Sequence, residues 1–369
     1  MKKKIKVAII GGGINSAVGK AHISALLLSN LYEITGAIFS RDENINTESK
    51  DFYNLTSINL YNDLNNLIIN RSDFQFVIVL TPTHTHFSVL SVLICHNINI
   101  ICEKALVSSL EEGNEISKLL QKSTSKLYVI YNYLGYTMIK YLKGIIQKGD
   151  IGKINSIHIE MPQEGFIKKI EDKPVNIQSW RLEDSSIPTI SLDLGVHLHI
   201  LIRYLTNKKP QQVFAIYRNN GNYDKITDDV NALIDFEDSM VCNMWYSKVA
   251  LGYLNGLRIR LFGDKAGVEW LQTNPDILHI SYLNGTKMIV DKSNVILNDK
   301  ELERYNHFKP GHPSGFIEAL SSYYIDIFDD FNGFSPFQKV FGIDESIEGL
   351  IMLDAFSQSF SQSKKIQLI

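Results

Sequence analysis

The sequence has little of several features that would assign a protein to a class at once. It contains 3 cysteines, Cys95, Cys102 and Cys242, which are too few and too widely spaced for a disulfide framework, and their apolar neighbours indicate buried free thiols. The net charge is only −3, so the basic surface typical of nucleic-acid-binding proteins is not expected. Internal repeats and low-complexity segments are also lacking.

No long apolar run is present either. The basic start, residues 2–4, leads into an apolar segment that glycines soon interrupt, so this is neither a secretory signal nor a membrane anchor. A cytoplasmic protein without a membrane partner is therefore expected. With 369 residues, 44% of them hydrophobic and 21% charged, the chain is long enough for two domains with cores of their own.

A glycine-rich turn organises the first part of the chain. Residues 6–10, a lysine followed by four apolar residues, are typical of a buried parallel strand, and residues 17–29 have helical spacing. Between them stand Gly11, Gly12 and Gly13. A helix start offers unpaired N–H groups and the positive end of its dipole, so we expect this turn to bind a dinucleotide pyrophosphate. Ile14, the next residue, joins the expected cofactor contacts.

The spacing departs from the common G-x-G-x-x-G pattern. Counting from Gly11 and Gly13 places Ser16 at the third glycine position, and Gly19 follows three residues later. We interpret this as a three-residue insertion that leaves Gly19 to make the close contact between helix and strand. An ordinary strand-helix turn is the alternative that this stretch alone leaves open.

The end of the second predicted strand bears on the choice of cofactor. Residues 33–39 are followed by Ser40 and Arg41. An acidic residue here would accept hydrogen bonds from the adenosine ribose of NAD, whereas an arginine suits the 2′-phosphate of NADP. The sequence therefore favours NADP, although Asp42 and Glu43 keep NAD open and Arg41 has a second interpretation as a solvated surface charge.

Strands and helices alternate up to about residue 131. A loop at the end of the strand 76–80 would line the cofactor crevice, so Thr81 and Pro82 are expected cofactor contacts. His84 and His86 resemble a metal pair, but no carboxylate or cysteine nearby completes a ligand set, so no metal is expected and His86 is assigned to the cofactor loop. The pattern predicts a parallel sheet. Its further strands are expected at residues 57–60, 98–102 and 127–131.

The pattern changes after this point. A helix over 136–148 is followed by a strand-rich region with a hairpin turn at Asn284 and Gly285, and helices over 315–331 and 343–361 end the chain. We therefore predict an α/β protein with a dinucleotide-binding domain at residues 1–132 and a second domain at 133–369 built on a large mixed or antiparallel sheet. Its strands are expected at residues 154–161, 212–217, 230–236, 240–247, 257–262 and 268–272.

One face of this second sheet is expected to meet a partner. Leu233, Trp245 and Phe262 alternate with the buried positions of their strands, and large apolar side chains on an exposed face usually contact another surface. We expect a homo-oligomer, a dimer or a tetramer, formed through this sheet.

An acid/base pair is predicted in the second domain. Asp193 and His197 are four residues apart, so on a helix they would share a face. A carboxylate in that place can fix the tautomer of the imidazole, orient the ring and favour its protonated form. A purely structural pair is the alternative.

Together these motifs resemble the Gfo/Idh/MocA oxidoreductases, the family of glucose-fructose oxidoreductase and inositol 2-dehydrogenase. The resemblance covers essentially the whole chain. It is carried by the order of Gly11-Gly12-Gly13 with His22, Thr81-Pro82, Glu103-Lys104, Trp180-Arg181 and Asp193-Leu194-Gly195-Val196-His197.

The resemblance implies an N-terminal Rossmann domain followed by a C-terminal α/β domain, and hydride exchange between a nicotinamide and a sugar or polyol carbon. In this interpretation Glu103 contacts the nicotinamide ribose, Lys104 lies beside the cofactor and holds the substrate oxygen, His197 is the acid/base group and Asp193 supports it. The chemistry agrees, because oxidising a secondary alcohol needs a base near the hydroxyl and a positive charge for the developing alkoxide. Lys104 as a plain surface lysine is the alternative.

Two positions depart from the family pattern. Ala105 replaces the proline that follows the motif lysine, and Ile200 stands where relatives often have a carboxylate. We further expect the substrate pocket to include Tyr133, Trp180, Arg181 and His312, with Arg181 suited to a carboxylate or phosphate on a sugar.

The sequence supports a NAD(P)-dependent dehydrogenase of sugars, polyols or sugar derivatives. The rival class is a dinucleotide-binding sensor or regulator that kept the fold without catalysis. A third possibility is an enzyme of the same fold that acts on a non-sugar carbonyl.

Overall fold

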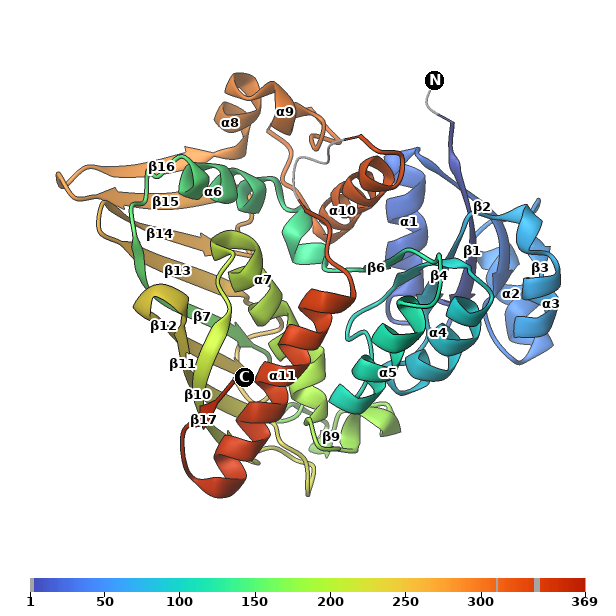
Figure 1. Cartoon of the computed structure of the whole chain (residues 1–369), viewed down its shortest axis with the longest axis horizontal. Coiled ribbons are helices and arrows are strands. Elements are labelled where there is room, and N and C mark those ends of the chain that lie inside the picture. The colour runs from blue at the N-terminus through green and yellow to red at the C-terminus, as the bar shows by residue number, and fades with distance from the viewer. Residues whose placement is uncertain (1–2, 310, 335–338, 369) are drawn as a thin grey trace. The chain divides into compact units, whose positions relative to one another are not determined.

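The computed structural model describes residues 3–309, 311–334 and 339–368, and it divides into two compact units. The first unit contains Met1–Gly135 and Gly315–Ile347, and the second contains Tyr136–Ser314 and Glu348–Ile369 (Figure 1). This grouping differs in one respect from the division expected at residue 132, because the segment Gly315–Ile347 returns to the first unit.

The first unit is built on a six-stranded parallel sheet in the order β3-β2-β1-β4-β5-β6. The central strand β4 is buried at all five positions, which explains its continuous apolar sequence. The predicted Rossmann-type α/β architecture is confirmed. The strands are β1 Ile5–Gly11, β2 Tyr32–Ile38, β3 Asn59–Leu60, β4 Phe76–Leu80, β5 Asn99–Cys102 and β6 Leu127–Val129.

Three helices of this unit begin where the sequence supplies a capping side chain. Asp42 and Asp63 accept backbone N–H bonds at the starts of two helices, and Ser109 caps a third. The carboxylate of Glu112 accepts the N–H of Ser108 at this third start. The helices are α1 Gly19–Ser29, α2 Glu43–Phe52, α3 Leu64–Ile69, α4 His86–Cys95, α5 Leu110–Leu120 and α10 Phe316–Phe331, with short helices η1 Arg71–Asp73, η2 Thr83–Thr85 and η3 Asn132–Gly135.

The second unit contains a nine-stranded sheet in the order β16-β15-β14-β13-β7-β12-β11-β10-β17. Neighbours are antiparallel except for β7 and β12, so the sheet is mixed, as expected. The strands of this unit, with a separate small hairpin β8-β9, are β7 Ile154–Pro162, β8 Lys169–Ile170, β9 Lys173–Pro174, β10 Pro210–Arg218, β11 Asp229–Phe236, β12 Met240–Ser247, β13 Arg258–Gly263, β14 Ala266–Leu271, β15 Ile277–Tyr282, β16 Lys287–Asp291 and β17 Ile366–Gln367.

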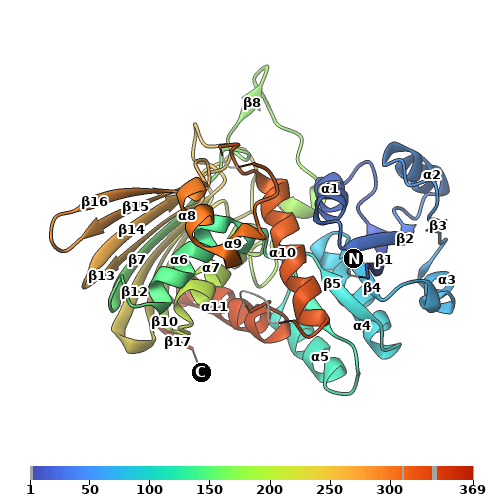
Figure 2. The same ribbon diagram turned by 90° about the horizontal axis from the view of Figure 1, so that it is seen from above.

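Helices cover one face of this sheet. Figure 2 shows α6 and α7 on that side. The opposite face exposes large apolar side chains, with Leu233 42% and Phe262 43% exposed, and among the described residues no helix covers it. The remaining helices are α6 Thr137–Gln147, η4 Ser179–Leu182, η5 Ser191–Gly195, α7 Val196–Thr206, η6 Glu237–Ser239, α8 Lys292–Asn298, α9 Lys300–Glu303 and α11 Ile343–Gln362, whose first five residues belong to the first unit.

Several local expectations changed. Cys102 and Cys242 are buried, but Cys95 at the end of α4 is exposed, so the prediction of three buried thiols is wrong for Cys95. The helix after the glycine turn begins at Gly19 and not at residue 17. The hairpin at Asn284 and Gly285 is confirmed, and Gly285 has the positive φ that its turn requires. None of the described helices combines the length and apolar composition needed to cross a bilayer.

Candidate functional site

The glycine turn of the first unit brings strand β1 and helix α1 into close contact. Gly11 and Gly12 have φ values of +81° and +73°, which favour glycine. A Cβ on Gly19 would lie only 1.9 Å from the carbonyl oxygen of Gly12. The expected role of Gly19 in close helix-strand packing is therefore confirmed, and the start of α1 lies directly against the turn.

Side chains from α2 and the following loop hold this turn in place. The N–H of Ile14 donates to Ser49 Oγ at 3.1 Å, and Tyr53 donates its hydroxyl to the carbonyl of Gly12 at 2.9 Å. Burial raises the pKa of Tyr53, so its hydroxyl keeps its proton at neutral pH. The hydroxyl of Ser16 accepts the N–H groups of Val18 and Gly19, which shapes the inserted residues before the helix.

The loop after β2 carries Ser40 and Arg41, the two residues expected to decide between NAD and NADP. Arg41 is exposed, and Ser40 accepts the N–H of Asp42 at 3.1 Å. The Asp42 carboxylate accepts the N–H groups of Asn44 and Ile45, so it serves as the N-cap of α2.

His86 joins the loops at the ends of β4 and β5. Its fully buried ring contacts the carbonyl oxygens of Thr81 at 2.7 Å and Ala105 at 2.9 Å. Burial lowers the pKa of His86, although the carbonyl contacts favour the charged ring. Thr81 also accepts a hydrogen bond from Thr85 at 2.8 Å. Within the described ranges, no group of three His, Cys, Asp or Glu side chains is placed to hold a metal ion.

Glu103 and Lys104 follow the end of β5. The N–H of Glu103 donates to the Val79 carbonyl at 3.0 Å, and the Lys104–Ala105 peptide bond is cis. The carboxylate of Glu103 accepts a 2.9 Å hydrogen bond from His22, a residue of α1. Because β1, β4 and β5 are neighbouring parallel strands, the glycine turn, Thr81 with Pro82, and Glu103 with Lys104 all lie at one edge of the sheet.

A cluster of charged side chains surrounds Asp193 in the second unit. Its Oδ2 lies 2.8 Å from Nη1 of Arg181 and 2.6 Å from Nζ of Lys248. The Arg181 guanidinium stacks over Trp180 at 4.4 Å, and the buried Lys248 lies over the ring of Phe166 at 4.8 Å. Sequence reasoning missed Lys248, because a lysine directly after strand β12 carries no signal that distinguishes it from a surface residue.

The segment that carries Asp193 is a π-helix, Ser191–Gly195, which continues into α7. The wider turns of a π-helix change which residues share a face. The Asp193–His197 pair was expected from α-helical spacing, so it stays a prediction. His197 is buried, 5% exposed, in the first turn of α7. π-Helical turns occur frequently at functional sites.

The remaining candidates lie elsewhere in their units. Tyr133 is buried in η3 of the first unit. His312 is exposed in a turn of the second unit, where its carbonyl accepts a 3.0 Å bond from Lys292. Their assignment to a substrate pocket stays a prediction.

Two family models match the two parts of the chain, and a related protein matches most of it. Residues 5–131 match the model of an oxidoreductase family with an NAD-binding Rossmann fold, and residues 139–269 match the model of the GFO/IDH/MocA C-terminal domain. The uncharacterized oxidoreductase YfiI of Bacillus subtilis (strain 168) is 28% identical over 295 residues, which cover 75% of this chain and 73% of that protein.

Solved structures match along almost the entire length. An inositol dehydrogenase homolog from Azotobacter vinelandii, complexed with NADH and myo-inositol, has a TM-score of 0.83 at 22% identity and covers 100% of this chain and 98% of its own. A levoglucosan dehydrogenase in complex with NADH and L-sorbose has a TM-score of 0.87 at 19% identity and covers 99% of both chains. At these identities the likeness shows the fold.

Proposed function

The chain belongs to the GFO/IDH/MocA family of NAD-binding oxidoreductases, and from this premise we propose that it transfers hydride between a nicotinamide dinucleotide and a secondary alcohol or ketone carbon of a sugar, polyol or sugar derivative. The observation that carries the proposal is the sheet edge of the first unit, where the glycine turn follows β1 and Lys104 follows β5, the two parallel strands on either side of β4. Ligands of open α/β sheets bind outside the carboxyl ends of the strands. The myo-inositol and L-sorbose in the matched complexes support the substrate class.

In this proposal the chemistry is divided among three side chains. The glycine turn and Glu103 would hold the dinucleotide, which when bound would supply the hydride acceptor. When the alcohol is oxidised, His197 would take the hydroxyl proton and Lys104 would stabilise the developing negative oxygen. Asp193 supports the site as an anion. Its bonds to Arg181 and Lys248 hold the carboxylate in place.

Alanine variants of Lys104 and His197 test these roles. We expect Lys104→Ala and His197→Ala each to lower kcat/KM by about 10²- to 10⁴-fold, the usual contribution of a positioned acid/base or charged group. The assay follows nicotinamide absorbance with a panel of polyols, aldoses and nucleotide sugars. Lys122→Ala and His96→Ala, which change exposed residues of the first unit, are the matched controls. Full activity of either site variant would show that its role is assigned wrongly.

We favour NADP over NAD. Asp42, one of the two acidic residues that kept NAD open, uses its carboxylate as the N-cap of α2, while Arg41 is exposed beside it. The prediction is that Arg41→Ala weakens NADPH binding by about tenfold or more and leaves NADH binding unchanged, because only NADPH carries the 2′-phosphate. Titration of intrinsic fluorescence with each nucleotide measures both affinities. An equal loss of affinity for NADPH and NADH would contradict the preference for NADP.

The charged cluster bears on the substrate. One guanidinium nitrogen of Arg181 is engaged by Asp193, but a guanidinium carries five donors, so the same side chain can also meet a carboxylate or phosphate on a sugar. Carboxylated and phosphorylated sugars therefore belong in the panel. A non-sugar carbonyl compound is the remaining alternative.

The rival function is a dinucleotide-binding sensor without catalysis. Ala105 in place of the motif proline is the feature that favours it. Wild-type protein that binds NADPH or NADH tightly but turns over nothing across the panel would support the sensor and contradict the dehydrogenase.

We also propose that the protein acts in the cytoplasm as a homo-oligomer, a dimer or a tetramer. The support comes from the uncovered face of the second unit's sheet, which forms a hollow of about 360 Å³ lined by β7, β10, β11, β12 and β13. Leu233 and Trp245 line this hollow, and Phe262 packs edge-on against its lining residue His158. A second copy of the same sheet would cover these apolar side chains.

A further inference from the structure

A buried chain of hydrogen bonds runs from Glu103 into the core of the first unit. The Nε2 of His22 lies 2.9 Å from Oε1 of Glu103, and its Nδ1 lies 2.8 Å from the hydroxyl of Tyr324. His22 is 2% exposed and Tyr324 is fully buried, whereas the Glu103 side chain is 13% exposed. The chain therefore begins at the sheet edge and ends out of contact with water.

The chemistry of the three groups fixes the direction of these bonds. An ionised carboxylate only accepts, so His22 donates its Nε2–H to Glu103. In a neutral ring Nδ1 is then an acceptor, so the Tyr324 hydroxyl donates to it. Burial, and to a smaller extent the charge of Glu103, raises the pKa of Tyr324 well above its usual value, so this hydroxyl keeps its proton. Tyr324 thus selects the tautomer that serves Glu103.

The imidazole also has a fixed place between elements. His22 lies in the first turn of α1, three residues after Gly19. The ring of Tyr324 on α10 packs edge-on against His22, with centroids 6.0 Å apart, and against Tyr32, at 5.4 Å. Tyr32 donates its hydroxyl to the backbone carbonyl of Tyr324 at 2.7 Å. These contacts leave His22 little freedom to rotate.

We propose that His22 is a positioning residue for the dinucleotide site, holding the Glu103 carboxylate in one rotamer for the nicotinamide ribose, and that Tyr324 acts through His22 by fixing its tautomer. This inference rests on the proposed function, in which Glu103 contacts that ribose. A carboxylate already held by one N–H loses less conformational entropy when a ribose hydroxyl binds, so the arrangement raises cofactor affinity.

Removal of the Tyr324 hydroxyl distinguishes a positioning role from a merely structural one, because only a positioning role predicts a specific loss of cofactor affinity. In Tyr324→Phe the ring stays but the donor to Nδ1 is lost, so a neutral His22 can place its proton on Nδ1 and turn a lone pair toward Glu103. The charged and titratable groups around the ring are Glu103 and Tyr324. Tyr32 packs against Tyr324, and Asp326 acts on Tyr32.

We expect Tyr324→Phe to weaken NADH binding about threefold to tenfold, the size of one hydrogen bond. The double variant His22→Gln/Tyr324→Phe should recover most of the affinity, because a glutamine amide can donate to Glu103 and has no tautomer for Tyr324 to select. Tyr32→Phe is the matched control. It removes a buried hydroxyl that bonds the same helix α10, and it should lower Tm without changing NADH affinity.

The outcomes separate the two proposals. Wild-type protein that fails to bind either NADH or NADPH would overturn the proposed function and this inference with it. Wild-type binding together with a Tyr324→Phe affinity equal to that of Tyr32→Phe would overturn the inference alone.

Discussion

At the scale of single residues, the closest backbone approach in the glycine turn makes the sharpest prediction. Gly19→Ala places a methyl group where the carbonyl of Gly12 lies 1.9 Å away, so α1 must move from the turn. We expect the free energy of unfolding to fall by about 3 kcal/mol or more and dinucleotide binding to be lost. Thermal and urea unfolding measure the first effect, and NADPH titration measures the second.

Gly144→Ala is the control for that substitution. Gly144 lies inside α6, and nothing lies within 4 Å of the Cβ that the change would add. Replacing a helical glycine by alanine at an open position should stabilise the protein by about 0.5–1 kcal/mol. Equal effects of the two substitutions would contradict the packing argument for Gly19.

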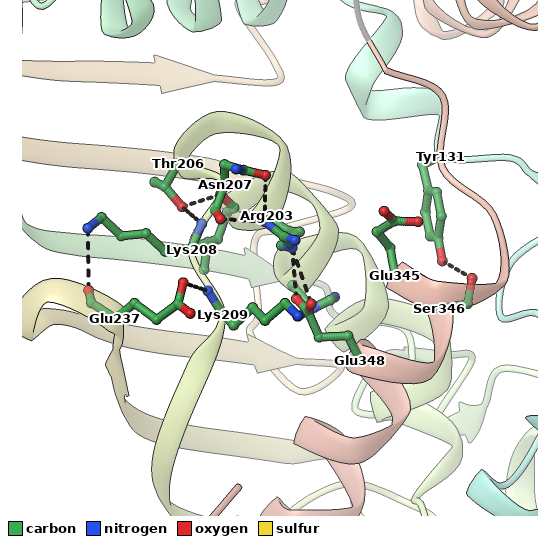
Figure 3. Close-up of polar contacts among 12 residues, drawn as sticks. Tyr131, Arg203, Thr206, Asn207, Lys208, Lys209, Glu237, Glu345, Ser346 and Glu348 are labelled. Atoms are coloured by element: carbon green, nitrogen blue, oxygen red, sulfur yellow. Dashed lines mark hydrogen bonds and ion pairs between the residues drawn. The ribbon is translucent and has the colours of Figure 1, made fainter. Parts of the chain in front are cut away.

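At the scale of elements, an ion pair network in the second unit joins helices α7 and α11. Glu348 accepts from His199 Nε2 at 3.0 Å and pairs with Arg203 Nε at 3.1 Å. Figure 3 shows Arg203 and Glu348 side by side. Burial alone would raise the pKa of Glu348, but the hydrogen bond from His199 and the charges of His199, Arg203 and Lys209 outweigh it and lower the pKa below its ordinary value of 4.5. The charged carboxylate therefore stabilises this helix pair.

The sign of the pH dependence follows from that lowered pKa. The stabilisation is complete above pH 4.5 and is lost as the pH falls through the lower, folded-state pKa. Glu348→Gln should reduce the free energy of unfolding by about 1–3 kcal/mol at pH 7, and its difference from wild type should shrink below about pH 4.5. Urea unfolding at a series of pH values measures this. Glu48→Gln, an exposed position on α2, should show neither effect, and a constant Glu348→Gln difference at all pH values would contradict the assignment.

The elements were largely predictable because their signals are local. Residues 76–80 and 230–236 carry the continuous and the alternating apolar patterns of a fully buried and a half-buried strand, and both became strands. The π-helix at Ser191–Gly195 was not predictable, since its hydrogen-bond pattern is set by packing around it and not by apolar spacing. The Lys248–Asp193 bond was missed because it joins residues 55 positions apart.

At the scale of the whole molecule, the uncovered sheet face predicts the state of assembly. If a second copy covers Leu233 and Phe262, the double variant Leu233→Lys/Phe262→Lys buries two charges without partners and should shift the protein to a monomer. Light scattering coupled to size exclusion measures the mass. Leu283→Lys, at an 84% exposed position in the β15–β16 turn, should leave the mass unchanged. A monomeric wild type would contradict the proposal.

Long-range structure explains what the sequence alone left out of the candidate site. The order of motifs was enough to indicate the family, and His22 was part of that order. Its bond to Tyr324 spans 302 positions, and no local pattern marks a tyrosine in an apolar helix as the partner of a distant imidazole. The return of Gly315–Ile347 to the first unit was missed for the same reason.

That return sets the order of events while the protein is being made. Because α10 is synthesised after nearly all of the second unit, the first 135 residues leave the ribosome without the helix that packs on α1. The intervening chain can fold first, and its compaction shortens the loop that α10 must close to reach α1. A newly made molecule can therefore complete its first unit only near the end of translation, after Gly315–Ile347 has emerged.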